Sequence, residues 1–200
     1  MPRISVVDRL SLWRERPLAA CIVAVLAIAA CVASVVAAPG RPGYLGAGLA
    51  LIAIAIAVID ARWFIIPNEL SAAGFALALV NAASGAPDAI WEAIGIAVLR
   101  GGVLALLFLG LREVYRRFRG RDGIGLGDVK LAGVAGAWLD WTTMPIAIEI
   151  AALSAIAAFG VRYYAASRVL DASAKFPFGL FLAPSIWIGW LMEVTLLAPI

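Results

Sequence analysis

Two aspartates at the edges of apolar segments are the side chains of this sequence best suited to chemistry. Asp60 ends an apolar run, and Asp128 lies in the stretch GIGLGDVKL (123–131), directly before another apolar run. When two carboxyls come within hydrogen-bond reach, one holds a proton while the other is ionised. Such a pair can hydrolyse a peptide bond, because the ionised carboxyl takes a proton from water and the protonated carboxyl donates to the carbonyl oxygen.

Other hydrolytic chemistries have few candidate residues in this chain. It contains no histidine and two cysteines, Cys21 and Cys31, which lie in the first apolar run without CxxC spacing. This composition excludes a histidine base and argues against a zinc site. We therefore expect no metal and no cofactor. The structural alternative is that Asp128 caps a helix and that Asp60 is a solvated residue at a membrane edge.

The composition predicts a membrane protein. The 200 residues are 64% hydrophobic and 14% charged, whereas soluble domains carry roughly 25% charged residues. A helix that crosses a bilayer needs about 20 apolar residues. We expect one domain over residues 1–200, an all-α polytopic membrane helix bundle with about seven transmembrane helices: 17–38, 43–60, 67–84, 90–111, 126–141, 143–164 and 177–197.

The basic residues predict how this bundle is oriented. If the amino terminus is inside, all of the 16 lysines and arginines except Arg41 and Arg100 fall on the cytoplasmic side. The carboxyl terminus is then outside, and Asp60 and Asp128 lie at the same, cytoplasmic face. We interpret the basic stretch LREVYRRFRGRDG as a topology anchor beside lipid headgroups, so no nucleic-acid partner is expected.

Several neighbours of the aspartates have types that can shape a site. Gly125 and Gly127 carry no side chains beside Asp128, which lets a substrate backbone approach the acid. Lys130 has two interpretations: it lowers the pKa of Asp128 or meets a substrate carboxylate, or it extends to the membrane interface.

Other residues are expected to act through the backbone or inside the bundle. Pro67 and Asn68 suit the start of the third helix, and Pro177 and Gly179 the start of the last one. Arg100 and Glu149 have similar predicted depths in the membrane, so we expect them to form a structural ion pair. The small-residue runs GYLGAG and GVAGA predict close contacts between helices.

Three stretches of the sequence resemble a known family. GLGDVKL matches the GxGD signature of intramembrane aspartyl proteases, and IDARWFIIPNEL and KFPFGLFLAP are similar to segments of the type IV prepilin peptidases. The resemblance runs from about residue 50 to the end of the chain. It is closest to the compact members, which lack the methyltransferase region with paired CxxC motifs, so N-methylation is not expected.

The resemblance implies a function and a set of site residues. The chain would be a membrane aspartyl endopeptidase of the bacterial inner membrane that removes the short basic leader of type IV pilin-like precursors at the cytoplasmic face. Those precursors and membrane lipids would be its partners, and Asp60 and Asp128 the catalytic pair. The residues implied to bind substrate or shape the site are Gly125, Gly127, Lys130, Pro67, Asn68, Pro177, Phe178 and Gly179.

Two alternatives remain open from the sequence. A presenilin-like intramembrane protease shares GxGD, but it would carry a Pro-Ala-Leu element near the end, where this chain has FLAPSIW. A non-enzymatic transporter or assembly factor would use both acids as helix caps or ion ligands.

Overall fold

The computed structural model describes residues 17–120, 123–165 and 177–197, and this part of the chain folds as helices without β-strands. Each of the seven apolar segments forms a helix, so the prediction of an all-α polytopic membrane bundle is confirmed. The helices are α2 (Pro17–Ala37), α3 (Arg41–Trp63), α4 (Asn68–Gly85), α5 (Ile90–Arg119), α6 (Leu126–Trp138), α7 (Thr143–Ala165) and α8 (Gly179–Leu196).

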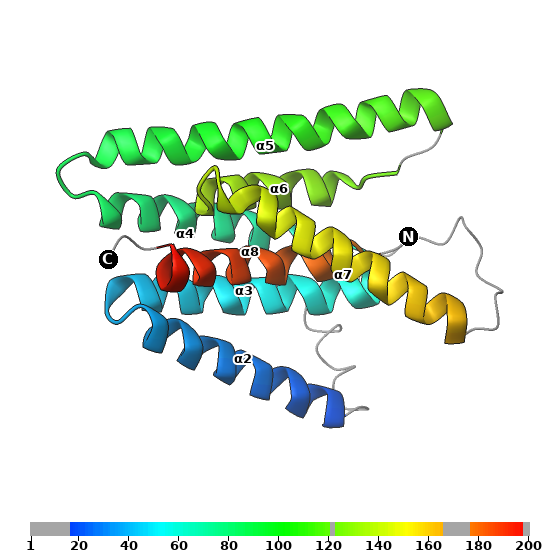
Figure 1. The fold of residues 1–200 in the computed structure, drawn as a ribbon, viewed down its shortest axis with the longest axis horizontal. Coiled ribbons are helices and arrows are strands. Elements are labelled where there is room, and N and C mark those ends of the chain that lie inside the picture. Colours follow the sequence, from blue (N-terminus) through cyan, green and yellow to red (C-terminus); the bar gives the residue numbers. More distant parts are fainter. Residues whose placement is uncertain (1–16, 121–122, 166–176, 198–200) are drawn as a thin grey trace.

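The centre of the bundle is the pair α3 and α8, which pack side by side (Figure 1). Helix α2 packs on α3 on one side of this pair, and α4 and α6 pack against it on the other. Helix α5 covers α4 and α6, and α7 packs against α8. The end of α3 and the start of α6 lie at the same end of the bundle (Figure 1).

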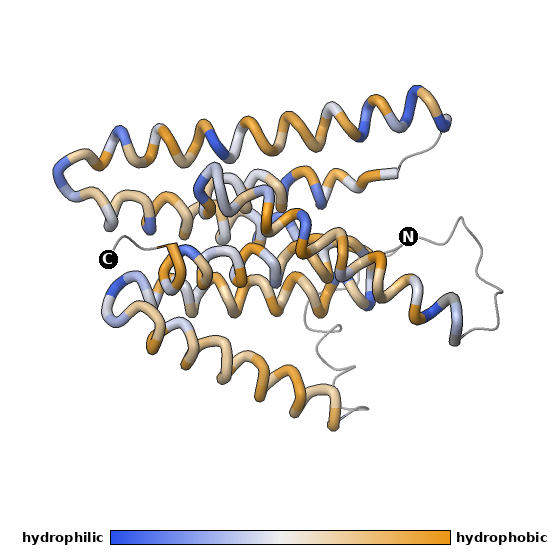
Figure 2. The backbone as a smooth tube through the Cα atoms, in the orientation of Figure 1, coloured by the Kyte–Doolittle hydropathy of each residue, from blue (hydrophilic) through white to orange (hydrophobic). Residues whose placement is uncertain are grey.

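Five helices are long and apolar enough to cross a membrane: α2, α3, α5, α7 and α8. Their outer faces expose large apolar side chains, among them Leu18, Trp91 and Leu106, and hydrophobic residues dominate much of the tube in Figure 2. Lipid tails can cover such faces, whereas water would not. The protein is therefore an integral membrane protein.

Helix α6 is different, because it is short and enclosed by protein. It has 13 residues, or about 20 Å of helix, and every residue from Leu131 to Trp138 is buried. The Trp138 indole donates a hydrogen bond to the carbonyl of Gly74 on α4 at 3.0 Å. Helix α6 is too short to cross a bilayer. It is held in the bundle by its contacts with neighbouring helices.

Helix α5 continues past the predicted end at residue 111 to Arg119, where Gly120 ends it in a left-handed conformation (φ 65°). Ion pairs support the added turns: the Glu113 carboxylate binds Arg116 at 2.8 Å and Arg117 at 3.2 Å. Spacings of three and four residues place these side chains on one helix face. The basic stretch LREVYRRFRGRDG, interpreted above as a topology anchor, is therefore helical as far as Arg119.

Small residues allow the backbones of α5 and α6 to touch. A Cβ atom at Gly136 would lie 2.5 Å from the Arg100 carbonyl oxygen, and one at Gly101 would lie 2.8 Å from the Gly133 carbonyl oxygen. On α3, a Cβ atom at Gly46 would overlap the Trp190 ring of α8. The close helix contacts predicted from GVAGA and GYLGAG are confirmed.

The predicted pairing of Arg100 with Glu149 is wrong. Arg100 forms its ion pair with Asp140, which follows α6. The reason is the packing order: α5 packs against α4 and α6, whereas α7, which carries Glu149, packs against α8. Glu193 of α8 joins the same cluster, because its carboxylate accepts hydrogen bonds from the Asp140 backbone N–H at 2.6 Å and from the Thr143 hydroxyl.

The α5–α6 contact generates a stability prediction. We expect Gly136→Ala to lower the free energy of unfolding by about 1–3 kcal/mol, because the added methyl group must displace the α5 backbone. Gly102→Ala on α5 is the control, since nothing lies within 4 Å of a Cβ atom there, and alanine favours helix over glycine. Thermal unfolding in detergent micelles measures both, and an equal response of the two variants would contradict the close contact.

Candidate active site

Asp60 lies in the last turn of α3 and is 5% exposed. Its Oδ2 atom accepts a hydrogen bond of 3.0 Å from the backbone N–H of Leu180, in the first turn of α8. Backbone N–H groups at a helix start have no partner within the helix and favour a negative charge. The first turn of α8 therefore holds the Asp60 carboxylate in place.

A left-handed residue ends α3 just after Asp60. Phe64 has φ 55° and ψ 38°, and its N–H donates to the Asp60 carbonyl at 2.9 Å. Such a conformation is uncommon for a residue other than glycine. Helix α3 ends there, and Ile66, two residues farther along the chain, is buried.

Asp128 is the third residue of α6 and is partly buried. Its Oδ2 atom accepts a hydrogen bond of 3.1 Å from the Gly125 backbone N–H, so it does cap the helix start. Burial raises the pKa of Asp128 to about 6, the Gly125 hydrogen bond acts in the opposite direction, and the charge of Asp60 raises the pKa further. The two carboxyls are therefore near enough to influence each other's ionisation.

Ile66 connects the two aspartate-bearing ends. A Cβ atom at Gly127 would lie 3.0 Å from the Ile66 Cβ, and one at Gly179 would lie 2.7 Å from its Cδ1. The same Gly179 Cβ would lie 2.9 Å from Asp60 Oδ2. The Ile66 side chain thus packs against the starts of α6 and α8, and both glycines are needed for that approach. Sequence reasoning missed Ile66, since an isoleucine in an apolar sequence carries no distinguishing signal.

Lys130 contacts neither aspartate in the described structure. Its Nζ atom donates to the Asn68 Oδ1 atom at 2.5 Å, and both side chains are exposed. Asn68 is the first residue of α4, so this hydrogen bond joins the starts of α4 and α6. The structure places Lys130 as a link between helices, an arrangement that neither sequence interpretation included.

The prolines and Phe178 organise helix starts at this same end. The Pro67 carbonyl accepts hydrogen bonds from the Ser71 N–H at 3.2 Å and the Ser71 hydroxyl at 3.1 Å. The Phe178 carbonyl accepts from the N–H groups of residues 181 and 182, both at 3.0 Å, and Pro177 before it is buried. The predicted site residues therefore gather where α3 ends and where α4, α6 and α8 begin.

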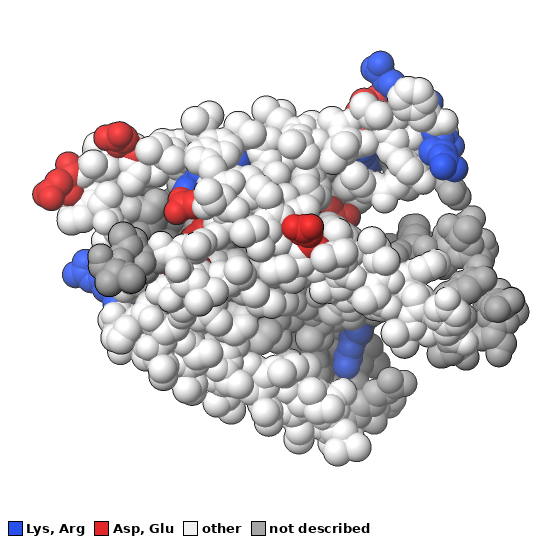
Figure 3. All heavy atoms as spheres, in the orientation of Figure 1, with Lys and Arg blue, Asp and Glu red and all other residues white. Residues whose placement is uncertain are grey.

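Charge differs between the two ends of the long helix α5. Its last turn carries Arg116, Arg117 and Arg119, and its first turn carries Glu92. Figure 3 shows blue basic atoms and red acidic atoms gathered at opposite ends of the upper part of the molecule. The basic end of α5 lies at the end of the bundle where α6 begins (Figure 1).

The sequence model that matches this chain describes the type IV leader peptidase family, and it covers residues 47–161, more than half of the chain. The chain belongs to the type IV leader peptidase family. The family predicted from the three motifs is confirmed. The match favours this family over the presenilin-like proteases.

Curated relatives agree with the family. The chain is 39% identical over 108 residues to "Leader peptidase HopD" of Salmonella typhimurium, a match that covers 52% of this chain and 62% of the relative. It is 33% identical over 187 residues to "Prepilin leader peptidase/N-methyltransferase" of Escherichia coli K12, covering 92% of this chain and 77% of the relative. A protein of the latter name from Aeromonas hydrophila is 28% identical over 179 residues, covering 88% and 57%.

The chain thus spans less than two thirds of the Salmonella and Aeromonas relatives. No solved structure matches it.

The raised pKa of Asp128 predicts how stability depends on pH. A carboxyl whose pKa is higher in the folded than in the unfolded state stabilises the fold at low pH, and this contribution is lost as the pH rises through the folded-state pKa. We expect the Tm of the wild type, relative to Asp128→Asn, to fall as the pH rises from about 4 to about 6 and to level off above that, because the unfolded chain ionises first. Thermal unfolding of both proteins across this range tests it, and a constant difference would contradict the shift.

Proposed function

We propose that this chain is a membrane aspartyl endopeptidase that cleaves the leader from type IV pilin-like precursors, with Asp60 and Asp128 as its catalytic pair. The observation that carries the proposal is the convergence of the helix ends that bear these carboxyls: Gly127, beside Asp128, and Gly179, beside the Asp60 carboxylate, both pack against Ile66. The family match and the names of the relatives support the choice of substrate.

The surroundings of the two carboxyls favour different roles for them. Asp128, with its pKa of about 6, is the general acid that donates its proton to the carbonyl oxygen of the scissile peptide bond. Asp60, held by the Leu180 N–H, is the general base that removes a proton from water. The resulting hydroxide attacks the carbonyl carbon. When the carbon–nitrogen bond breaks, the proton on Asp60 passes to the leaving amine, and Asp128 takes back a proton from a hydroxyl group of the tetrahedral intermediate as the carbonyl re-forms.

The glycines beside Asp128 have separate functions in this proposal. A Cβ atom at Gly125 would lie 3.1 Å from Asp128 Oδ2, so a side chain there would crowd the acid on an exposed part of the loop. Gly125 therefore leaves room for a substrate backbone. Gly127 instead makes room for Ile66 and acts by holding the start of α6 against the turn after α3.

We place the active site at the cytoplasmic face of the bacterial inner membrane. The distribution of bases along the sequence supports this orientation, and so does the basic last turn of α5 at the end of the bundle where α6 begins. The leader in this proposal is cut at the level of the lipid headgroups. Some relatives carry "N-methyltransferase" in their names, but no methyltransferase activity is proposed for this chain.

Substitution of either aspartate tests the catalytic pair. We expect Asp60→Asn and Asp128→Asn each to lower cleavage of a pilin-like precursor by a factor of about 10² to 10⁴, because general acid–base catalysis contributes on that order. The exposed Asp88, which precedes α5, supplies the control variant Asp88→Asn. Gel-shift detection of the processed precursor, made with equal amounts of each enzyme in membranes, measures the loss. Processing that persists in either site variant would rule out the pair.

The proposed roles also predict a pH profile. If Asp128 must be protonated, kcat/KM should decline above an apparent pKa near 6, which belongs to the coupled pair rather than to one residue. The profile is measured with the precursor in detergent micelles between about pH 4 and about pH 8, two units either side of the expected value. A kcat/KM that rises steadily with pH across this range would contradict the proposal that Asp128 must be protonated.

A further inference from the structure

Two side chains from the basic end of α5 contact the loop that leads to Asp128. The Arg112 Nη1 atom donates a hydrogen bond of 3.0 Å to the Ile124 carbonyl. Almost one turn farther along α5, the Tyr115 ring lies against Gly123, where a Cβ atom would overlap it. Because residues three apart share a face of a helix, one face of α5 holds the loop at two successive residues.

Arg112 differs in this contact from other arginines of the same stretch. Arg116 and Arg117 bind Glu113, which lies on α5 itself. Arg112 is partly buried, and its hydrogen bond reaches the segment that begins α6. Anchoring a helix end beside lipid headgroups requires a positive charge but no such contact. The position of Arg112 therefore indicates a role besides membrane orientation.

One peptide group links Arg112 to Asp128. Its carbonyl, from Ile124, accepts the Arg112 hydrogen bond. Its N–H, from Gly125, donates to Asp128 Oδ2 at 3.1 Å. The carbonyl and the N–H of a planar trans peptide point in opposite directions, so a cation on one side and a carboxyl on the other align with the peptide dipole. Because hydrogen bonds in series polarise one another, Arg112 strengthens the donor that meets Asp128.

The Gly125 N–H also favours one position for the proton of Asp128. In a neutral carboxyl group one oxygen carries the proton, and the other, carbonyl-type oxygen is the better hydrogen-bond acceptor. The Gly125 N–H occupies Oδ2, so the proton of the neutral acid belongs on Oδ1. A general acid works best when its proton is held in a fixed direction.

The loop needs a contact from outside to keep this peptide group in place. Gly123 and Gly125 stand on either side of Ile124, and glycine restricts the backbone least of all residues. The Ile124 side chain is partly buried and packs against the core, while its carbonyl is held by Arg112. Arg112 and the core contact together fix the orientation of the peptide group that meets Asp128.

We propose that Arg112 is a positioning residue, which acts through the Ile124–Gly125 peptide group to hold the Asp128 carboxyl with its acid proton on Oδ1. The inference rests on the proposed function, in which Asp128 is the general acid. It concerns a residue that does not touch the substrate and that acts only through the backbone of the loop.

Other charged groups lie on the helices around Asp128. The charge of Asp60 raises the pKa of Asp128, and the Gly125 hydrogen bond lowers it. Lys130 is exposed and binds Asn68. Because Arg112 acts on the Gly125 hydrogen bond, loss of Arg112 should raise the pKa of Asp128 further. The charged side chains on the ends of the helices near Asp128 are Asp60 and Arg62 of α3, Glu69 of α4, Arg112, Glu113, Arg116, Arg117 and Arg119 of α5, and Lys130 of α6.

Substitution of Arg112 tests the proposal through the pH profile. Arg112→Met keeps the length of the side chain and removes its donors, whereas Arg112→Lys keeps a cation that can donate to the Ile124 carbonyl. We expect Arg112→Met to lower kcat for the precursor by about tenfold with KM within about twofold, as for a group that acts in the transition state. The pH above which kcat/KM declines should rise by about half a unit, and Arg112→Lys should restore most of both.

Two further variants make the kinetic test specific. Arg117→Gln is the matched control, since it removes one positive charge from the same helix at a side chain that is 79% exposed. We expect its kcat to stay within about twofold and its pH profile to match the wild type, because exposed ion pairs contribute little. Arg112→Gln keeps a neutral donor, so it should fold where Arg112→Met fails and give a smaller shift in the same direction.

Thermal unfolding tests the link between Arg112 and Asp128 without any substrate. In the wild type, the Tm relative to Asp128→Asn levels off near pH 6, where the pKa of Asp128 lies. A higher pKa in the folded state extends this decline to higher pH. The Tm of Arg112→Met, relative to the double variant with Asp128→Asn, should therefore level off about half a unit higher. The corresponding pair made with Arg117→Gln should level off where the wild type does.

The outcomes separate this inference from the proposed function. A wild-type enzyme that does not cleave the precursor would contradict the function, and the thermal measurement would still decide whether Arg112 acts on Asp128. If the wild type cleaves, but the pH limit of kcat/KM or the levelling pH of the Tm in Arg112→Met coincides with that of Arg117→Gln, the inference is overturned. A purely structural role predicts this second result, with a lower Tm at every pH. Upward shifts of both limits, reversed in Arg112→Lys, support the inference.

Discussion

The hydrogen bond from the Leu180 N–H to the Asp60 carboxylate is the contact on which the arrangement of the site depends. It ties the end of α3 to the start of α8, two segments far apart in the sequence. A carboxylate buried to 5% exposure needs such a donor, because an unpaired charge is strongly disfavoured away from water. The same contact requires glycine at 179, since a Cβ atom there would meet both the carboxylate and Ile66.

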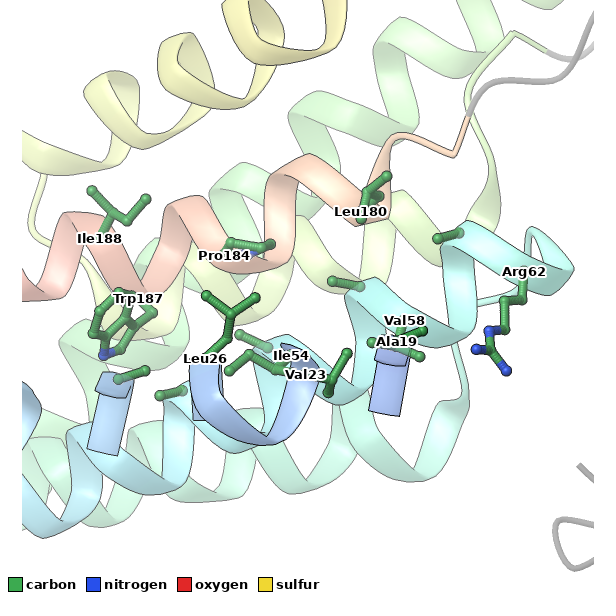
Figure 4. A pocket seen from close by; sticks show the side chains of 15 residues that line it. Ala19, Val23, Leu26, Ile54, Val58, Arg62, Leu180, Pro184, Trp187 and Ile188 are labelled. Carbon is green, nitrogen blue, oxygen red and sulfur yellow. The ribbon is translucent and has the colours of Figure 1, made fainter. Parts of the chain in front are cut away.

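Glycines allow helices of this bundle to approach one another closely at several places. At the site, Gly127 and Gly179 let α6 and α8 reach Ile66. At the crossing of α5 and α6, Gly101 and Gly136 let two helix backbones touch. Inside a membrane, helices gain little from leaving lipid for protein, so tight packing and hydrogen bonds must hold them together. An apolar cavity between α2, α3 and α8 is a place where this packing is incomplete, and its lining includes Ala61 and Leu180, which neighbour Asp60 (Figure 4).

A second polar cluster, away from the two aspartates, also pairs its charged groups with partners. Arg100 pairs with Asp140, and Glu193 accepts hydrogen bonds from Asp140 and Thr143. Ionisable groups in a membrane protein are most stable when they face each other inside the bundle. This cluster joins α5, α7 and α8 with the segment after α6, whereas the aspartate site joins the ends of α3, α4, α6 and α8. Each cluster thus joins a different set of helices through polar contacts.

The sequence by itself determined the class of the protein, its seven helical segments and the family, because apolar length, basic flanks and short motifs are local properties of a chain. It also singled out the two aspartates as candidates for a site. The tertiary structure decided which residues meet. It paired Arg100 with Asp140 rather than Glu149, joined Lys130 to Asn68, and placed Ile66 between two glycines. Such contacts depend on the order in which helices pack and on the angle at which they diverge. Neither quantity is encoded in the spacing of residues along a single segment.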